Sequence, residues 1–437
     1  MRKTKVKVAV AFEYPHVGCW PCIDFDAQKE TQRIMEPITA LNPNMDFDVA
    51  MYNTRKEAEA DYPQDLLKYD GVLVLLMTTW KQIDIFYIEQ SRSGIPTIVA
   101  DVPLCGSGSA LGHASPAIRE GNYPVPLLST LDYSELAVAV RAFDVIAKMK
   151  QTTILVISND VTEKHSAPFE QAWGCKFVHK SSADIVALSN TVARSDALPI
   201  AQRWMREAAE VKEPTEEDVI ESAIFHLAIK QMMQDVGADA VTLDCLSLPY
   251  FGSYDANARR YPCMSHYEML NHGTVAVCEA DLPATVTSLI VQYLTGRPGF
   301  VSDPAIDTSS NQILYAHCVG CTKVFGKDDP RRCKFVMRSH AEDNKGTSVQ
   351  IIFPANEDVT TLMIYPGSAV IHSGRSVGNV GLQEGCRSKL AAEANTKALL
   401  RNWNGAWHRV TVFGDYREAL MQLCLIKGIR VQEEDVL

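Results

Sequence analysis

The sequence lacks any uninterrupted apolar stretch long enough to span a membrane, which takes about 20 predominantly apolar residues. Its first residues, MRKTKVKVAVAF, run directly into a strand-like pattern, without the apolar core and cleavage site of a signal peptide. We therefore expect a soluble, cytoplasmic protein that has no membrane partner.

Positive charge is in deficit: 42 Lys and Arg face 53 Asp and Glu, a formal net charge of −11 at pH 7. Such a surface repels nucleic acids and anionic lipids on average, so we expect neither as a partner. The sequence also has no P-loop and no strong cluster of basic residues for a phosphate. A small, unphosphorylated ligand fits these absences.

Cysteine, in contrast, is plentiful, with 12 residues. Without a secretion signal, they are expected to be reduced thiols and not a disulfide framework. Two CxxC pairs occur, Cys19 and Cys22 in GCWPC and Cys318 and Cys321 in HCVGC. Each pair could be a redox couple or half of a zinc site, but we favour small buried residues as the interpretation.

A chain of 437 residues is too long for a single hydrophobic core. Strand-like runs (KVKVAVAF, DGVLVLLMTT, GIPTIVADVP) alternate with helix-compatible segments over residues 1–150, which indicates an N-terminal α/β domain. This rhythm restarts at TTILVIS and predicts a second α/β domain over residues 151–325. Residues 326–437 hold short β runs and one plausible helix, YREALMQLCLIKG, and are expected to form a β-rich domain, either a barrel or a sandwich. The predicted fold class is α/β: two Rossmann-like or flavodoxin-like domains plus a C-terminal domain resembling an antiparallel β-barrel.

Residues 215–237 predict one well-delimited amphipathic helix. Thr215 can cap it, three acidic residues follow in the first turn, and Gly237 can end it. His226 lies within this helix among Ile224, Phe225 and Leu227, so we expect a core or boundary histidine and not a metal ligand.

Residues able to bind metal or move protons end three successive strand-like runs. TVAVCE ends in Glu279, GFVSD ends in Asp303, and QILYAHC carries His317. In an open α/β sheet, ligands gather outside the carboxyl ends of the strands, so the three side chains are expected in one crevice. Asp281 precedes Leu282, Pro283 and an apolar-periodic run, which predicts a helix N-cap and an architectural role.

Carboxylate oxygens and imidazole nitrogens without sulfur suit Mn²⁺, Mg²⁺ or Co²⁺ better than a structural zinc site. His408 in WHRVTVFGDY is a fourth candidate ligand, and it could equally be a surface or packing histidine. His340 in RSHAEDNKG is a weaker candidate of the same kind.

The stretches VAVCEADLPATVTSLIVQYLTGRPGFVSD, ILYAHC, RSHAEDNKGTSVQ and WHRVTVFGDY resemble the L-fucose isomerase family, with L-arabinose isomerase as a more distant relative. The resemblance is most specific over residues 262–317 and 338–416. It implies that Glu279 and Asp303 are both Mn²⁺ ligands and the catalytic carboxylates that relay a proton. It also implies that His408 is the C-terminal ligand and His317 an additional one.

The activity implied by this resemblance is isomerisation of an aldose to a ketose through an enediol, on a free deoxyhexose, pentose or modified relative. It further implies a homo-oligomer, a trimer or hexamer, in which His16, Trp20 or Trp80 could reach a neighbouring subunit's site. Two alternatives stay open: another metal-assisted proton transfer on a sugar acid, by an epimerase or lyase, and a non-catalytic sugar-binding protein of the same fold. The sequence does not identify the sugar.

Overall fold

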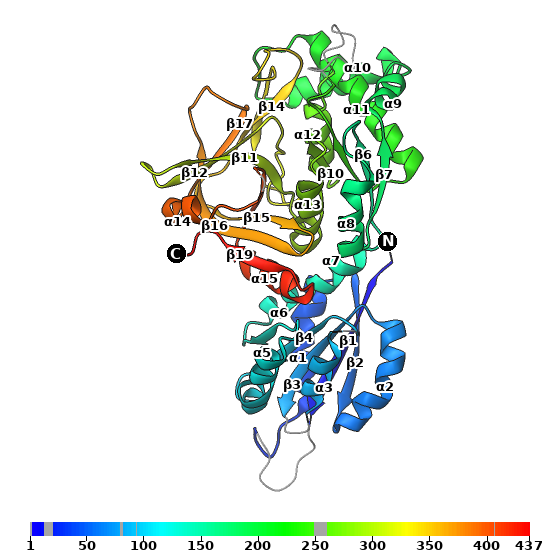
Figure 1. The fold of residues 1–437 in the computed structure, drawn as a ribbon, viewed down its shortest axis with the longest axis vertical. Coiled ribbons are helices and arrows are strands. Elements are labelled where there is room, and N and C mark those ends of the chain that lie inside the picture. The colour runs from blue at the N-terminus through cyan, green and yellow to red at the C-terminus, as the bar shows by residue number, and fades with distance from the viewer. Residues whose placement is uncertain (1, 13–20, 79–81, 93, 249–259, 406) are drawn as a thin grey trace. The chain divides into compact units, whose positions relative to one another are not determined.

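The computed structural model of the chain describes residues 2–12, 21–78, 82–92, 94–248, 260–405 and 407–437 (Figure 1). Two compact units divide it. The first unit comprises Met1–Lys148 and Glu418–Arg430, and the second comprises Met149–Arg417 and Val431–Leu437. The predicted three-domain division stays a prediction.

The first unit is built on a five-stranded parallel sheet with the order β2-β1-β3-β4-β5. The three predicted strand runs are confirmed as β1, β3 and β4, whereas β2 and β5 were not predicted. The strands are β1 (Thr4–Phe12), β2 (Met45–Tyr52), β3 (Gly71–Thr78), β4 (Thr97–Asp101) and β5 (Leu127–Ser129). Its helical segments are α1 (Ala27–Leu41), α2 (Arg55–Lys68), α3 (Ile83–Gln90), α4 (Ser107–Ser109), η1 (Ala110–Ala114), α5 (Ser115–Gly121), α6 (Tyr133–Ala139) and α7 (Arg141–Met149).

Helices cover both faces of this sheet because successive side chains of a strand point to opposite faces. On β1, Val6, Val8 and Val10 join the hydrophobic cluster formed with α1 and α6. Ala9 and Ala11 join the cluster formed with α2 and α3 on the other face. The near-continuous apolar runs in the sequence follow from this two-sided burial.

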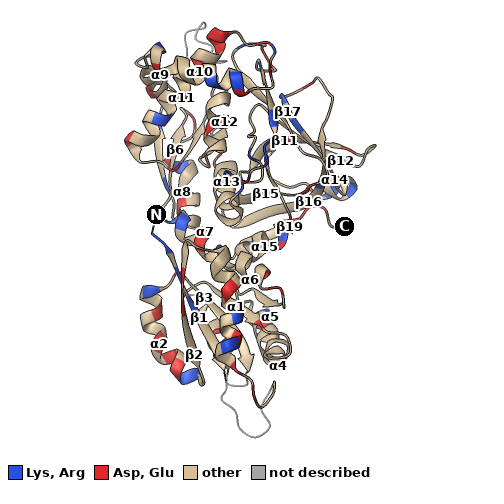
Figure 2. Ribbon diagram, turned by 180° about the vertical axis from the view of Figure 1, so that it is seen from behind, with Lys and Arg blue, Asp and Glu red and all other residues tan. Residues whose placement is uncertain are grey.

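Charged side chains of both signs lie on α2, with Arg and Lys at its two ends and Glu and Asp between them (Figure 2). Arg55 pairs with Glu59 one turn later at 2.6 Å, and Thr54 forms a capping box with Glu57 at the start of the helix. Positive and negative side chains of α2 can therefore pair with one another along the helix. Within the described ranges, none of the helices combines the length and the apolar character that crossing a lipid bilayer requires.

The second unit contains a four-stranded parallel sheet with the order β10-β9-β6-β7. Its strands are β6 (Thr153–Ile157), β7 (Lys176–Lys180), β9 (Ala240–Leu243) and β10 (Val275–Cys278). Its helices are α8 (Glu163–Trp173), α9 (Ser182–Ser189), α10 (Arg194–Glu207), α11 (Glu216–Val236), α12 (Cys263–Asn271) and α13 (Leu282–Thr295). The predicted helix is confirmed as α11, with a capping box at Thr215 and a left-handed Gly237 at its end.

The same unit contains a closed six-stranded antiparallel barrel. Its strands follow the order β15-β18-β11-β12-β17-β16, and β15 pairs with β16 to close it, while β19 extends β16. The barrel strands are β11 (Phe300–Asp307), β12 (Gln312–His317), β15 (Asp358–Tyr365), β16 (Ser368–Asn379), β17 (Ser388–Glu393) and β18 (Arg409–Phe413), and the added strand is β19 (Arg430–Glu433). A small sheet orders β14 (Ser348–Ile352), β13 (Lys334–Arg338) and β8 (Glu210–Val211).

Two expectations about this region were wrong. The strands β11 and β12, which carry Asp303 and His317, belong to the antiparallel barrel and not to an open parallel sheet. Besides α15 (Arg417–Ile426), the C-terminal region also forms a second helix, α14 (Thr396–Asn402), which Asn395 caps. The sequence left a barrel and a sandwich open as architectures of the C-terminal region. The pairing of β15 with β16 closes the sheet, so the architecture is a barrel.

Helix α13 joins the parallel sheet to the barrel, because it packs against β9 and β10 on one side and against β11, β15 and β18 on the other. Its Thr287 hydroxyl accepts the backbone N–H of Ile364 on β15 at 2.9 Å. The start of α13 therefore has a fixed position relative to the barrel strands.

His226 provides a test of the core of the second unit. It is 4% exposed on α11 and contacts the Ser265 hydroxyl at 3.0 Å, in line with the predicted core role. Burial lowers the pKa of His226 to about 4, against about 6.5 in an unfolded chain. As the pH falls from 7 to 4, the unfolded chain therefore binds a proton that the folded chain excludes. The free energy of unfolding should fall by on the order of 3 kcal/mol through this group.

Urea unfolding at pH 7 and pH 4.5 checks this prediction. His226→Gln should show a smaller loss of stability between the two pH values than the parent chain, whereas the exposed-site control His113→Gln should show the full loss. An unchanged pH dependence in His226→Gln would contradict the prediction.

Candidate metal centre

The turn between β10 and α13 has an unusual backbone. Glu279 and Ala280 have φ values of 62° and 50°, in the left-handed region that residues with a Cβ rarely adopt. The Ala280 N–H donates to the Leu243 carbonyl at 3.1 Å and so ties the turn to β9. Each such conformation costs roughly 1–3 kcal/mol and persists where surrounding structure imposes it, commonly at functional sites. Here the turn carries the Glu279 carboxylate toward two histidines.

The barrel register brings the other three residues together. Ser302 of β11 pairs with Arg409 of β18, so that the next residue on β11, Asp303, lies beside His408. Asp303 also pairs with Ala316 of β12, next to His317. Three neighbouring antiparallel strands therefore present Asp303, His317 and His408 to one place.

The structure thus brings together Glu279, Asp303, His317 and His408, which we call the candidate metal centre. His408 Nε2 lies 3.1 Å from Asp303 Oδ1 and 3.6 Å from Glu279 Oε2. His317 Nε2 lies 3.8 Å from Glu279 Oε1. One ligand atom each of Glu279, His317 and His408 lies within 4.8 Å of the others. The predicted convergence is observed, although the strands reach it by another topology.

Three carboxylates surround the His408 ring and favour its protonated form. Burial lowers its pKa, but hydrogen bonds to Asp281 and Asp303 and the charge of Glu279 outweigh burial and raise the pKa to about 10. A proton on Nε2 holds the two nearby carboxylates in place as a divalent cation would. Loading of a metal at Nε2 must displace this proton.

His317 has the opposite character. Burial lowers the pKa of His317 to about 4, so its ring is neutral near pH 7 and has a lone pair to offer. In the part of the chain that the structure describes, His317 Nε2 is buried without a hydrogen-bond partner. A buried nitrogen left unpaired costs about 1–3 kcal/mol, which a bound cation would offset.

Glu279 is the part of the centre that is most open to solvent. Its side chain is 33% exposed, against 7% for His408 and 3% for His317. Burial raises the pKa of Glu279. The positive charge of His408 lowers it, and the negative charges of Asp303 and Asp281 raise it further. A carboxyl group with a raised pKa beside solvent-accessible space suits proton transfer to a ligand.

Asp281 has two partners, one predicted and one missed. Its Oδ1 accepts the Ala284 N–H at 2.8 Å and caps α13, which confirms the architectural prediction. Its Oδ2 also accepts from His408 Nδ1 at 2.7 Å, across 127 residues of sequence. This contact fixes the ring so that Nε2 faces Glu279 and Asp303, as carboxylates behind ligating histidines do in metal sites. No local pattern in the sequence indicates it.

The donor set fits a hard divalent cation. Two carboxylates and two imidazoles offer oxygen and nitrogen, the unpaired His317 Nε2 points to an absent partner, and Glu279 leaves one side accessible. This conclusion rests on the donor atoms of the four residues, and it holds for any hard divalent cation.

The remaining candidate residues from the sequence are not part of this four-residue centre. His340 contacts Cys318 Sγ at 3.1 Å through its Nε2. Cys318 and Cys321 are buried as expected, but Cys22 is exposed, so the expectation of burial is wrong for Cys22. Cys19, His16, Trp20 and Trp80 lie outside the described residues.

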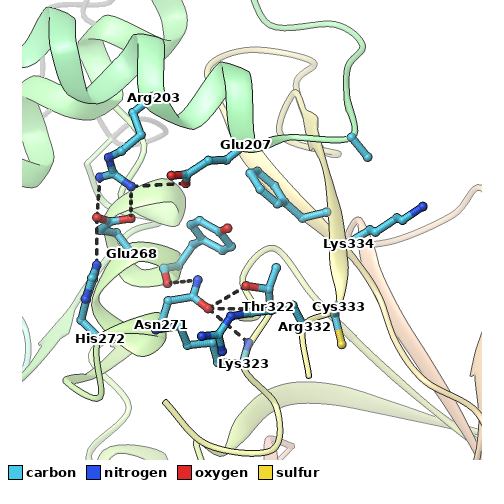
Figure 3. A pocket seen from close by; sticks show the side chains of 13 residues that line it. Arg203, Glu207, Glu268, Asn271, His272, Thr322, Lys323, Arg332, Cys333 and Lys334 are labelled. Atoms are coloured by element: carbon cyan, nitrogen blue, oxygen red, sulfur yellow. Dashed lines mark hydrogen bonds and ion pairs between the residues drawn. The ribbon is translucent and has the colours of Figure 1, made fainter. Parts of the chain in front are cut away.

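A pocket of about 680 Å³ also opens in the second unit (Figure 3). In it, Glu268 binds Arg203 at 2.5 Å and the Trp204 N–H at 3.0 Å. Asn271 Oδ1 accepts the Thr322 hydroxyl and the backbone N–H groups of Thr322 and Lys323. Because these buried polar groups already have partners, the pocket is a poorer candidate for chemistry than the metal centre.

No protein-family model matches the chain, and no curated protein matches it. Among solved structures, an ABC transporter periplasmic solute binding protein from Actinobacillus succinogenes 130z with bound D-allose is similar over 63% of this chain and 95% of that chain. The sequence identity is 11% and the TM-score is 0.20. A similarity at this level carries no argument about fold or function.

The double role of Asp281 predicts different effects for two substitutions. Asp281→Asn keeps a good N-cap but removes the charge beside His408, so the pKa of His408 in the metal-free protein should fall from about 10. Asp281→Ala should in addition lose about 0.5–2 kcal/mol of stability through the missing cap.

An NMR pH titration of the histidine rings, combined with urea unfolding, checks both outcomes. Glu393→Gln, at an exposed position on β17, is the charge-matched control and should change neither quantity. A His408 pKa that does not move in Asp281→Asn would show that the hydrogen bond contributes little.

Proposed function

We propose that the protein is a metal-dependent aldose–ketose isomerase that acts on a free sugar, a deoxyhexose, a pentose or a modified relative, through an enediol. The observation that carries the proposal is that Glu279, Asp303, His317 and His408 lie together. Among the described residues, the buried His317 Nε2 has no hydrogen-bond partner. The resemblance of the same segments to the L-fucose isomerase family supports it.

Four side chains would hold the cation, Mn²⁺ or alternatively Mg²⁺ or Co²⁺. They are the carboxylates of Glu279 and Asp303 and the Nε2 atoms of His317 and His408. A divalent cation supplies a Lewis acid for the carbonyl oxygen of an open-chain sugar and for the neighbouring hydroxyl oxygen. This matters because a proton beside a carbonyl is too weakly acidic to leave unless the developing negative oxygens are stabilised.

The carboxylates would move the proton. Glu279 has a raised pKa and the most exposed side chain of the four, so its oxygens can take the proton from one sugar carbon and return it to the next. Asp303, which is 26% exposed and lies 3.1 Å from His408 Nε2, can orient or exchange the hydroxyl protons. General acid–base catalysis of this kind typically contributes roughly 10²–10⁴-fold.

Asp281 and His408 would keep the centre in its geometry. Because Asp281 accepts from Nδ1, the neutral form of His408 keeps its proton on Nδ1 and presents an unprotonated Nε2. The left-handed turn at Glu279 holds its carboxylate 3.6 Å from His408 Nε2. We also propose that both α/β parts are Rossmann-like. The chain would form a homo-oligomer and be located in the cytoplasm.

Metal binding is the first test. The protein stripped with a chelator should bind Mn²⁺, followed by the loss of the free Mn²⁺ EPR signal. Asp281→Asn should weaken binding by roughly 10–100-fold, as expected for a residue behind a ligand. Asp303→Asn should weaken it more.

Asp307→Asn, further along β11, is the matched control and should bind like the parent chain. Equal affinity in the parent chain and in Asp303→Asn would rule out this centre as the metal site.

Deuterium incorporation tests the reaction. With Mn²⁺ and a panel of pentoses and deoxyhexoses in D₂O, one sugar should give the ketose, and an aldose re-formed from it should carry deuterium at the second carbon. A Glu279→Gln variant should lose turnover while its circular dichroism and melting temperature stay close to those of the parent chain. The control Glu393→Gln should keep turnover.

Three outcomes decide between the alternatives. Ketose formation without deuterium would mean a hydride shift instead of an enediol. Mn²⁺ binding without turnover on the whole panel would favour a sugar-binding protein. Deuterium exchange without ketose formation would favour an epimerase.

A further inference from the structure

Six cysteines of the second unit belong to one hydrophobic cluster beside the candidate metal centre: Cys245, Cys263, Cys278, Cys318, Cys321 and Cys386. The thiols of all but Cys321 act on one another, and we call these five the thiol cluster. Within it, Cys278 is within hydrogen-bonding reach of Cys245, and Cys318 is within reach of both Cys263 and Cys386. The sequence places these residues up to 141 positions apart, so that only the fold brings them together.

The Sγ atoms of Cys318 and Cys386 lie 3.4 Å apart. A disulfide bond is about 2.05 Å long, so an approach of about 1.4 Å would complete one. Cys318 follows the last residue of β12, and Cys386 lies in the segment 380–387, which forms neither helix nor strand between β16 and β17. A segment without backbone ladder bonds can make this adjustment without breaking the barrel.

The two thiols also differ in access. Cys318 is buried at 9% exposure, whereas Cys386 is half-buried and can meet a small solute. The imidazole Nε2 of His340 also contacts Cys318 Sγ, at 3.1 Å. Of the two thiols within reach of Cys318, Cys263 is buried and Cys386 is accessible, so we assign Cys386 as its partner and not the CxxC neighbour Cys321.

We propose that Cys318 and Cys386 form a redox modification site, which closes reversibly to a disulfide when a peroxide is the oxidant. The inference rests on the thiol geometry and does not depend on the proposed isomerase function. The bond would tether segment 380–387 to the residue that follows the candidate ligand His317. Because Cys318 directly follows His317 in the chain, the pair borders the candidate metal centre.

The chemistry balances in two steps. The sulfur of the accessible Cys386 attacks hydrogen peroxide: an S–O bond forms, the O–O bond breaks, and the thiol proton leaves with the departing oxygen as water. Cys318 then attacks the sulfenic sulfur: the S–S bond forms, the S–O bond breaks, and the Cys318 proton leaves in a second water. Two thiols lose two electrons in total, and one peroxide is reduced to two waters. A thiol reductant restores the pair by exchange.

The test uses the full chain carrying Cys22→Ser, which removes one partner of the other CxxC pair. Thiols are counted in denaturant before and after treatment with an excess of hydrogen peroxide, and peptides are mapped without reduction. Because a neighbouring thiol and burial raise the pKa of Cys386, its thiolate is scarce and the incubation should be long. The expected result is the loss of two thiols per chain, a linked peptide joining Cys318 to Cys386, and full recovery with dithiothreitol.

Two further variants sharpen the result. Adding Cys386→Ser should abolish the linked peptide and the loss of thiols, whereas adding the matched change Cys333→Ser, at another half-buried cysteine, should leave both unchanged. Retention of all thiols in the parent, a link from Cys318 to Cys263 or another cysteine, or an undiminished loss in Cys386→Ser would each overturn the assignment. Because the mapping on the parent needs no further variant, a folding defect in Cys386→Ser leaves the test decisive.

Discussion

The hydrogen bond between Asp281 and His408 is the contact on which the candidate metal centre depends. It joins Asp281, the N-cap residue of α13, to His408, the residue that precedes the barrel strand β18. Asp281 is itself fixed by capping the helix, and α13 is fixed by packing on both layers. The orientation of one imidazole ring is therefore set by helix capping, sheet packing and barrel register together.

Charge compensation explains how so many ionisable groups share this place. In the metal-free protein, a protonated His408 faces Glu279, Asp281 and Asp303, while His317 stays neutral behind them. The three carboxylates would repel one another without the central cation. In the proposed function, a metal ion would take the place of this proton among the same carboxylates.

The elements that were predicted correctly are those that a short stretch of sequence determines. The strands β1, β3 and β4 are buried on both faces and read as apolar runs, and α11 and α13 begin and end with ordinary capping residues. β2 was missed because this edge strand is largely polar along its exposed positions. The four residues of the candidate metal centre were named in advance, but Asp303 and His317 were placed on the wrong kind of sheet, because a short apolar run does not reveal whether its neighbours are parallel. The second contact of Asp281 and the pairing of Cys318 with Cys386 depend on residues 127 and 68 positions away, and no window of sequence contains them.

Closure of the barrel has a consequence for how this chain can vary. Each of the six strands is paired on both sides, so none can slide to absorb a change in length. A single residue inserted into β11 before Asp303 would turn its side chain to the other face of the strand, because alternate residues of a strand point to opposite faces. Length variation among related chains should therefore concentrate in connections such as 318–333 and 380–387, while the spacing from Phe300 to Asp303 and from His408 to Phe413 stays constant.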